Sequence, residues 1–338
     1  MTHCVNRTDA WGKYYIDHES NAVKICCEKQ GDRVRPLDHT RLQRHFEARD
    51  CYDTIGLYSL GTDSLGRWAA IDIDRHDETA TPEQTRSFAL EIYQSLRRIG
   101  FHPLLTDSDG KGGYHIRCFF REPITGDQLF RFARWLTQSW HKYGFTKRPE
   151  SFPKQPVIAP GRYGNWLRLL GRHPKRDHYP AGFDGRNWIE GDPLINYILR
   201  LPVSDPARIP REALKPEEAP IQRGAWNHAG RGDGTASWEE FDKRDDWEPM
   251  LEKHGWSRCS HAGEITYWTR PRKDDGVSAS LGHKCENGVR LFYPFTNATT
   301  LREGRYYTPS AFLASVEFNG DFKAANRYLR EKGYGKRG

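Results

Sequence analysis

The stretch WAAIDIDRHD at residues 68–77 is an apolar run that ends in two aspartates, Asp72 and Asp74. Apolar and acidic residues alternate here with the period of a β-strand, so both carboxylates are expected on one face. Neighbouring carboxylates repel each other, and a buried strand gains no stability from them. A hard divalent cation explains the pair, because Mg²⁺ prefers oxygen ligands and is commonly held by one or two carboxylates. The alternative is an exposed strand end that is merely acidic.

The composition is that of a globular chain with room for two or three domains. Of its 338 residues, 36% are hydrophobic and 29% are charged, and the mean hydropathy is −0.85. No apolar run approaches the roughly 20 residues of a membrane span. Residues 1–15 also lack the continuous apolar segment of a signal peptide. The sequence therefore predicts a cytoplasmic protein with no membrane partner.

Basic and aromatic residues are both abundant. The net charge is +7, and 52 Lys and Arg residues accompany 11 Trp, 16 Tyr and 16 Phe. Basic side chains attract phosphate backbones, and aromatic rings stack on unpaired bases. This composition favours a nucleic-acid partner, although alone it does not distinguish such a protein from one that is merely basic.

Seven cysteines without regular spacing argue against a disulfide framework. Two pairs, Cys259 with His261 and His283 with Cys285, would each lie on one face of a strand. If the strands face each other, the pairs supply four zinc ligands. The usual knuckle spacing is absent, so chance pairing is the favoured interpretation and zinc is not expected.

Composition divides the chain into three zones. Residues 1–202 carry alternating strand and helix patterns, with an N-terminal αβ extension over about residues 1–60. Residues 203–236 are rich in proline, mixed charge and glycine, which predicts a linker. Residues 237–338 form a smaller C-terminal αβ domain. In the first zone the pattern predicts helices over 37–49, 82–99 and 127–143, and strands over 54–60, 67–74, 102–108, 114–120 and 164–170.

A glycine-rich turn follows the aspartate pair, in the sequence LLTDSDGKGGYHIRCFF at 104–120. Its glycines allow close approach of a ligand, and the free N–H groups of such a loop can hold phosphate. Lys111 lies in the turn, and His115 shares a strand face with Arg117. Most glycine-rich turns only join hairpin strands, but this one combines a lysine and a histidine with a preceding Asp-x-Asp strand.

A third block, residues 148–176, adds one carboxylate and several basic residues. Glu150 is the acid, and the strand expected at 164–170 carries Arg168. Further basic residues follow at Arg172, Lys175 and Arg176, and a solvated basic rim is the simplest explanation for several of them.

These three blocks, in this order, resemble the archaeo-eukaryotic primase superfamily, most closely the primase-polymerases of plasmids, phages and TOTE conflict systems. The matching residues are Asp72 and Asp74, then Gly113-Tyr114-His115, then Glu150, then Arg168. The resemblance covers about residues 37–180. Relatives often have Asp where this chain has Glu150. The resemblance implies an α+β fold, with an RRM-like core of antiparallel sheet flanked by helices.

The resemblance also implies nucleotidyl transfer on a single-stranded DNA template. Asp72, Asp74 and Glu150 would hold two Mg²⁺ or Mn²⁺ ions. Ser108, Lys111, Gly113, His115 and Arg168 would bind the incoming (d)NTP, with Asp72, Asp74, Glu150 and His115 as the catalytic set. The sequence has no Gly-x-x-x-x-Gly-Lys-Ser/Thr motif, so a replicative helicase is expected on a separate chain.

Two rival functions remain to be weighed. A replication-initiator nuclease needs two histidines flanking one hydrophobic residue, and no such triplet occurs here. The second rival is a catalytically silent, primase-derived protein that only binds single-stranded nucleic acid. Intact Asp72, Asp74 and His115 argue against it. The sequence leaves open the choice of NTP or dNTP, initiation without a primer, the template motif, the oligomeric state and the setting, which is host replication, a mobile element or defence.

The C-terminal domain resembles a module attached to replication proteins of mobile elements, through residues 254–297 and the terminal stretch that ends in GYG. Trp256, Tyr267 and Trp268, with nearby Arg and Lys residues, are candidates for nucleic-acid contact. The alternative is that these aromatic rings form the core of a small domain.

Overall fold

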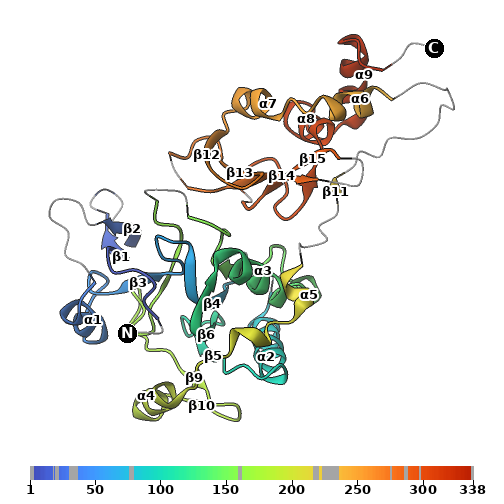
Figure 1. Ribbon diagram of the computed structural model, residues 1–338. Coiled ribbons are helices and arrows are strands. Elements are labelled where there is room, and N and C mark those ends of the chain that lie inside the picture. The colour runs from blue at the N-terminus through green and yellow to red at the C-terminus, as the bar shows by residue number, and fades with distance from the viewer. Residues whose placement is uncertain are drawn as a thin grey trace. The chain divides into compact units, whose positions relative to one another are not determined.

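The computed structural model describes residues 4–17, 19, 23–29, 37–75, 80–158, 162–215, 221–222, 236–274, 276–284, 288–296 and 298–335. The chain divides into two compact units, 1–217 and 218–338 (Figure 1). Cys285 of the proposed zinc set lies outside the described residues. Every helix in the described part of the chain is too short or too polar to span a bilayer.

The first unit is built on a six-stranded antiparallel sheet with the order β10-β9-β5-β6-β4-β7. The strands are β4 (Leu65–Ile73), β5 (Leu104–Asp107), β6 (Tyr114–Thr125), β7 (Glu150–Phe152), β9 (Gly182–Phe183) and β10 (Trp188–Ile189). Alternation along β4 points Ala69, Ile71 and Ile73 to one face, where they join the main hydrophobic core. Antiparallel sheets with helices confirm the predicted α+β class.

Two helices cover that face of the sheet, α2 (Pro82–Arg98) and α3 (Gly126–Leu136). Each begins with a capping box, Thr81 with Gln84 and Thr125 with Gln128, which satisfies N–H groups of the first turn. The helix predicted over 127–143 is too long, since α3 ends at Leu136 and a separate 3-10 turn, η1, follows at Trp140–Tyr143.

A second, four-stranded sheet packs on the opposite face of β4 and β6, so that the unit has three layers (Figure 1). Its order is β2-β1-β3-β8, with β1 (Ala10–Ile16), β2 (Val23–Lys29), β3 (Ile55–Tyr58) and β8 (Trp166–Arg168), and α1 (His39–Phe46) precedes β3. The core between the sheets contains Trp11, Ile55, Trp68 and Leu167. The predicted N-terminal extension therefore depends on β8 from outside it. Strands β3 and β4, although adjacent in sequence, belong to different sheets.

The linker predicted from residue 203 begins later in the structure. Ser204 donates its N–H to Phe119 O and accepts from Arg121 N–H, so the chain continues along β6. After helix α4 (Gly191–Arg200) and the 3-10 turn η2 (Pro206–Arg208) comes α5 (Arg211–Leu214). Ile209 and Ala213 are buried in the main core. The proline content of this segment predicted a flexible linker. Burial of Ile209 and Ala213 instead holds the segment against the core.

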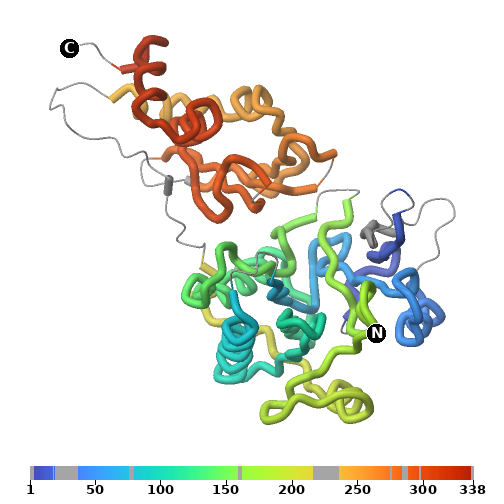
Figure 2. Tube along the Cα trace, turned by 180° about the vertical axis from the view of Figure 1, so that it is seen from behind, coloured from blue at the N-terminus to red at the C-terminus, as the bar shows by residue number. Residues whose placement is uncertain are grey.

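The second unit has its own six-stranded sheet, with the order β11-β16-β15-β14-β13-β12, and its own core. The strands are β11 (Ile221–Gln222), β12 (Ser257–Ala262), β13 (Ile265–Thr269), β14 (Ala279–Lys284), β15 (Arg290–Pro294) and β16 (Tyr306–Tyr307). Helices α6 (Ser237–Arg244), α7 (Trp247–Lys253), α8 (Pro309–Glu317) and α9 (Phe322–Glu331) gather on one side of it (Figures 1 and 2). Trp256, Tyr267 and Trp268 are buried, so these rings are not a nucleic-acid surface.

We expect residues 1–217 to fold as an isolated fragment, and residues 1–202 to be markedly less stable. Removing 203–217 leaves the sites of Ile209 and Ala213 empty, and loss of one large buried aliphatic side chain costs about 2–5 kcal/mol. Urea unfolding of both fragments measures the difference. Equal midpoints would show that residues 203–214 add nothing to the fold.

We also expect His45 to make the first unit sensitive to acid. Its ring is fully buried, Nδ1 accepts from Ile55 N–H, and Nε2 lies 2.9 Å from Leu170 O, the arrangement of a neutral imidazole. Burial lowers the pKa of His45 to about 4, from about 6.5 in the unfolded chain. The unfolded state therefore binds the extra proton, and stability present above pH 6.5 is lost as the pH falls towards 4.

The substitution His45→Gln keeps a neutral donor and acceptor but cannot titrate. Between pH 7 and 4.5 the wild-type protein should lose about 2 kcal/mol more unfolding free energy than the variant, which follows from the shift at about 1.4 kcal/mol per pKa unit. Chemical denaturation at several pH values tests this, with His39→Gln on the exposed face of α1 as the control. Parallel pH profiles for wild type and His45→Gln would refute it.

Candidate active site

One row of residues across the central sheet brings the first and third sequence blocks together. Asp72 on β4 pairs in register with His115 on β6 and, on its other side, with Glu150 on β7. Residues directly opposite each other in antiparallel strands point to the same face. The three side chains therefore share the face that the second sheet covers, at the end of the layer formed by Trp68 and Ala70.

A cavity of about 640 Å³ opens at this end of the two sheets. Of the predicted site residues, Asp72, Asp74, Ser108, Lys111, His115, Glu150 and Arg168 line it. Tyr14 of β1 and Trp166 of β8 contribute the wall from the second sheet. The cavity also has basic residues, among them Lys175 and Arg176, that the sequence had suggested were a solvated rim.

Gly113 does not line the cavity, but its lack of a side chain shapes it. A Cβ atom there would lie 2.6 Å from Ser108 Oγ and 3.4 Å from Asp74 Oδ1. Any other residue would push against the serine, and through the turn against the aspartate that follows β4. Glycine at position 113 therefore lets the glycine-rich turn pack closely against Asp74.

The turn itself is held by its own carboxylates. Asp107 Oδ1 accepts from Gly110 N–H at 2.7 Å, and Asp109 Oδ1 accepts from Lys111 N–H at 2.9 Å and Gly113 N–H at 3.1 Å. The prediction that free N–H groups of this loop hold phosphate is wrong for these three groups, because each already has a partner. These three N–H groups are therefore not available to a phosphate, and Lys111 is the side-chain candidate within the turn.

Asp107 and Asp109 also anchor the following loop, a role that the sequence did not reveal. Arg176 Nη1 lies 2.7 Å from Asp109 Oδ2, and His178 Nε2 lies 2.8 Å from Asp107 Oδ1. Side-chain contacts between residues about 70 positions apart have no local signature. The aspartates of the SDG turn were visible, but nothing in the sequence showed which partners they had.

Arg168 is buried, and its guanidinium donates hydrogen bonds to the backbone of two turns. Its Nη2 donates to Ser108 O at 2.6 Å and its Nη1 to Gly171 O at 3.2 Å, and the residue is 7% exposed. A guanidinium has five N–H donors, so these bonds leave others for the cavity that Arg168 lines.

His115 is held as one tautomer by its two neighbours. Arg117 Nη2 lies 3.0 Å from His115 Nδ1, and since a guanidinium can only donate, Nδ1 must be the acceptor. The ring proton is then on Nε2, which lies 3.0 Å from Asp72 Oδ1. Burial, together with the charges of Arg117 and Arg168, holds the pKa of His115 well below its usual range. A neutral imidazole thus lies against the Asp72 carboxylate, with Nε2 close to Oδ1.

Arg117 supports this arrangement from behind. It is 7% exposed, and its Nη2 also donates to Arg168 O at 2.7 Å. Burial lowers the pKa of Arg117 to about 10, with a further contribution from Arg168, so the group remains charged at neutral pH. Its Nη1 is buried without a hydrogen-bond partner among the described residues. Burying a charge that is only partly satisfied is costly, which is typical of a functional site.

Comparison with known protein families is consistent with this geometry. Residues 3–187 match the family described as the archaeo-eukaryotic primase domain of TOTE conflict systems. The chain belongs to this family. The archaeo-eukaryotic primases are primase-like nucleotidyltransferases, and the resemblance drawn from the three sequence blocks is confirmed. No curated protein matches the chain.

The carboxylates of this primase domain suit hard cations in part. Asp72 and Asp74 line one cavity, and oxygen ligands from one or two aspartates, completed by substrate phosphates, are what Mg²⁺ commonly uses. The described residues contain no ready-made cluster of three His, Cys, Asp or Glu side chains. Glu150, the proposed third metal ligand, forms an ion pair with Lys154. The donor set thus fits a metal that arrives with its nucleotide.

The proposed zinc residues lie in the second unit, on strands that do not pair. Cys259 and His261 are on β12 and His283 is on β14, and β13 separates the two strands. Strands two places apart are about 10 Å apart, so the pairs do not face each other as the sequence hypothesis required. Cys259 Sγ contacts Tyr267 O instead, at 3.2 Å. With Cys285 not described, zinc stays an untested hypothesis.

We expect Arg117→Met to release the His115 ring. The variant removes the donor to His115 Nδ1 and to Arg168 O, and an unsatisfied buried acceptor costs about 1–3 kcal/mol. Nitrogen-15 NMR of the histidine side chains should then show loss of the single Nε2–H tautomer at His115. Arg67→Met, which removes a half-buried arginine from β4, is the control. An unchanged tautomer would mean that Asp72 alone fixes the ring.

Proposed function

We propose that this chain is a DNA primase-polymerase that joins (d)NTPs on a single-stranded DNA template, with Mg²⁺ or Mn²⁺ as cofactor. The proposal rests mainly on one observation, the in-register row of His115, Asp72 and Glu150 beside Asp74. Membership of a primase family supports it. The sheet order β7-β4-β6-β5, with chain order β4-α2-β5-β6-α3-β7, also supports the RRM-like core expected of such enzymes.

The charges in the cavity suit a nucleoside triphosphate. Six Lys and Arg side chains and four Asp and Glu side chains line it. The Lys and Arg side chains can neutralise a polyanionic triphosphate, and the Asp and Glu side chains can hold the divalent metal ions. A site for an uncharged substrate would have no need of both sets together.

Each residue has a defined task in this proposal. Bound divalent ions would activate the attacking 3′-hydroxyl and stabilise the leaving pyrophosphate. Asp72 and Asp74 would supply the metal ligands, and His115 would hold Asp72 in orientation through its Nε2–H. Lys111 would contact the triphosphate as a mobile point charge. Glu150 would need to leave Lys154 before it could act as a third ligand.

We expect Asp72→Asn and Asp74→Asn to lower nucleotide incorporation by roughly 10²-fold or more, the scale of losing one charge-stabilising group. Asparagine has nearly the shape of aspartate, and both positions line a cavity, so folding should be preserved. The assay is extension of a labelled primer on single-stranded DNA with Mg²⁺ or Mn²⁺, with parallel reactions that contain NTPs or no primer. Asp192→Asn, an exposed residue in the first turn of α4, is the control.

The same assay separates the proposal from its rival. Incorporation by the wild type that disappears in both aspartate variants supports catalysis at this site. If the wild type binds single-stranded DNA but incorporates nothing under any of these conditions, the chain is a catalytically silent, primase-derived binding protein. Normal synthesis by either variant would move the chemistry elsewhere.

A further inference from the structure

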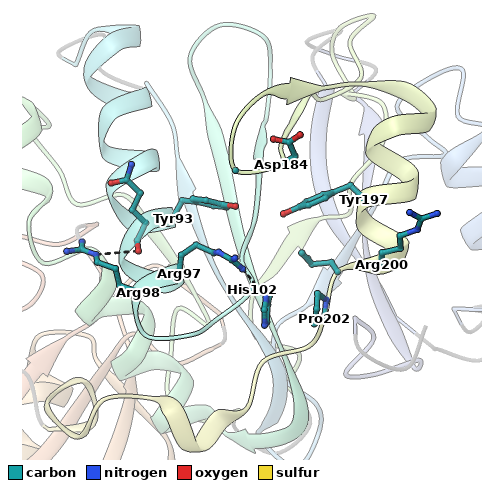
Figure 3. A pocket seen from close by; sticks show the side chains of 11 residues that line it. Tyr93, Arg97, Arg98, His102, Asp184, Tyr197, Arg200 and Pro202 are labelled. Atoms are coloured by element: carbon teal, nitrogen blue, oxygen red, sulfur yellow. Dashed lines mark hydrogen bonds between the residues drawn. The ribbon is translucent and has the colours of Figure 1, made fainter.

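A second cavity, of about 780 Å³, lies in the first unit between α2, α4 and the β9–β10 turn. Tyr93 and Arg97 of α2 line it, together with Tyr197 and Arg200 of α4, and the two tyrosines point toward each other (Figure 3). It is separate from the active site. The first turn of α2 lies against Gly112, whereas this cavity is at the C-terminal end of α2, and a 17-residue helix is about 25 Å long.

The arginines of the second cavity are not neutralised by the protein. Neither Arg97 nor Arg200 forms an ion pair with any described residue. The one acid in the lining, Asp184, caps its own turn, where its Oδ1 accepts from Arg186 N–H and Asn187 N–H, both at 2.7 Å. Guanidinium groups that line one cavity without an ion pair are suited to phosphate.

His102 and Tyr197 add no negative charge to the lining. Arg97 Nη1 lies 2.9 Å from His102 Nδ1, so that nitrogen is the acceptor and the ring N–H is on Nε2. Burial lowers the pKa of His102, and the charges of Arg97 and Arg208 lower it further, so the ring is neutral. Burial and a hydrogen bond with Tyr93 raise the pKa of Tyr197 to about 12, so this phenol adds no negative charge.

We propose that the second cavity binds a nucleotide unit, with its phosphate on Arg97 and Arg200 and its base against the partly exposed ring of Tyr197. The volume lies within the range of nucleotide-sized pockets. Tyrosine faces beside arginines are the combination that holds unpaired bases and their backbone. The unit can be a free nucleotide or part of a single strand, since both present the same chemistry. The inference does not require the catalysis proposed above, because binding is measured without turnover.

Hydrogen–deuterium exchange of the full-length protein tests this in EDTA, with ATP and a 5′-phosphorylated oligothymidylate as separate probes. At least one probe should protect peptides that cover residues 91–103 and 183–202. In the double variant Arg97→Gln/Arg200→Gln, the probe concentration for half protection should rise about tenfold or more, because charge-assisted hydrogen bonds to the phosphate are lost. Arg327→Gln/Arg330→Gln on α9 removes the same charge elsewhere and serves as the control.

The two probes distinguish the source of the nucleotide. Protection by ATP assigns the cavity to free nucleotides, and protection by the oligonucleotide alone assigns it to a strand. Protection by neither probe, or protection that persists unchanged in Arg97→Gln/Arg200→Gln, overturns the proposal. Thermal unfolding of the variants checks that they are folded, which is expected because both arginines are exposed. Failure of primer extension would leave this result unaffected.

Discussion

The residues around the candidate active site depend on the hydrogen bonds of one buried group, the guanidinium of Arg117. It extends from β6 of the central sheet, donates to Arg168 O on β8 of the second sheet, and donates to His115 within its own strand. One buried group therefore joins the two sheets and fixes the tautomer of His115, which lies beside Asp72. An apolar residue here would pack at lower desolvation cost, but it would leave the carbonyl and the imidazole without donors.

Close packing of the two sheets imposes a second constraint on the same cavity. The ring of Trp166 lies over Gly12 and Gly56, where an added Cβ atom would come within 2.1 Å and 2.0 Å of it. Only glycine on β1 and β3 lets the indole lie flat across those strands. Because Trp166 also lines the cavity, the two glycines shape the active site without contacting a substrate.

Local sequence patterns predicted helices and strands better than they predicted which strands pair with each other. The period-2 run of β4 and the helical spacing of Phe88, Ile92 and Leu96 depend on nearest neighbours, and the structure has both. The in-register pairing of Glu150 with Asp72 depends on strands 78 residues apart, which no local pattern encodes. Composition was also a weak guide to burial. It suggested a linker over residues 203–236 and left open whether Trp256 and Trp268 contact nucleic acid or form a core, yet Ile209, Ala213 and both tryptophans are buried.

The two cavities of the first unit differ in the residues that lie beside their basic side chains. In the active site Asp72, Asp74 and Glu150 share the cavity with lysines and arginines, so it can hold metal and phosphate together. The second cavity has arginines and tyrosines, and its one acid is already bonded to its own turn. With one carboxylate in its lining, the second cavity offers a divalent metal fewer oxygen ligands than the candidate active site does. Under the proposed function such a division would be useful, since a strand or nucleotide held in the second cavity would add affinity without competing for the reacting phosphates.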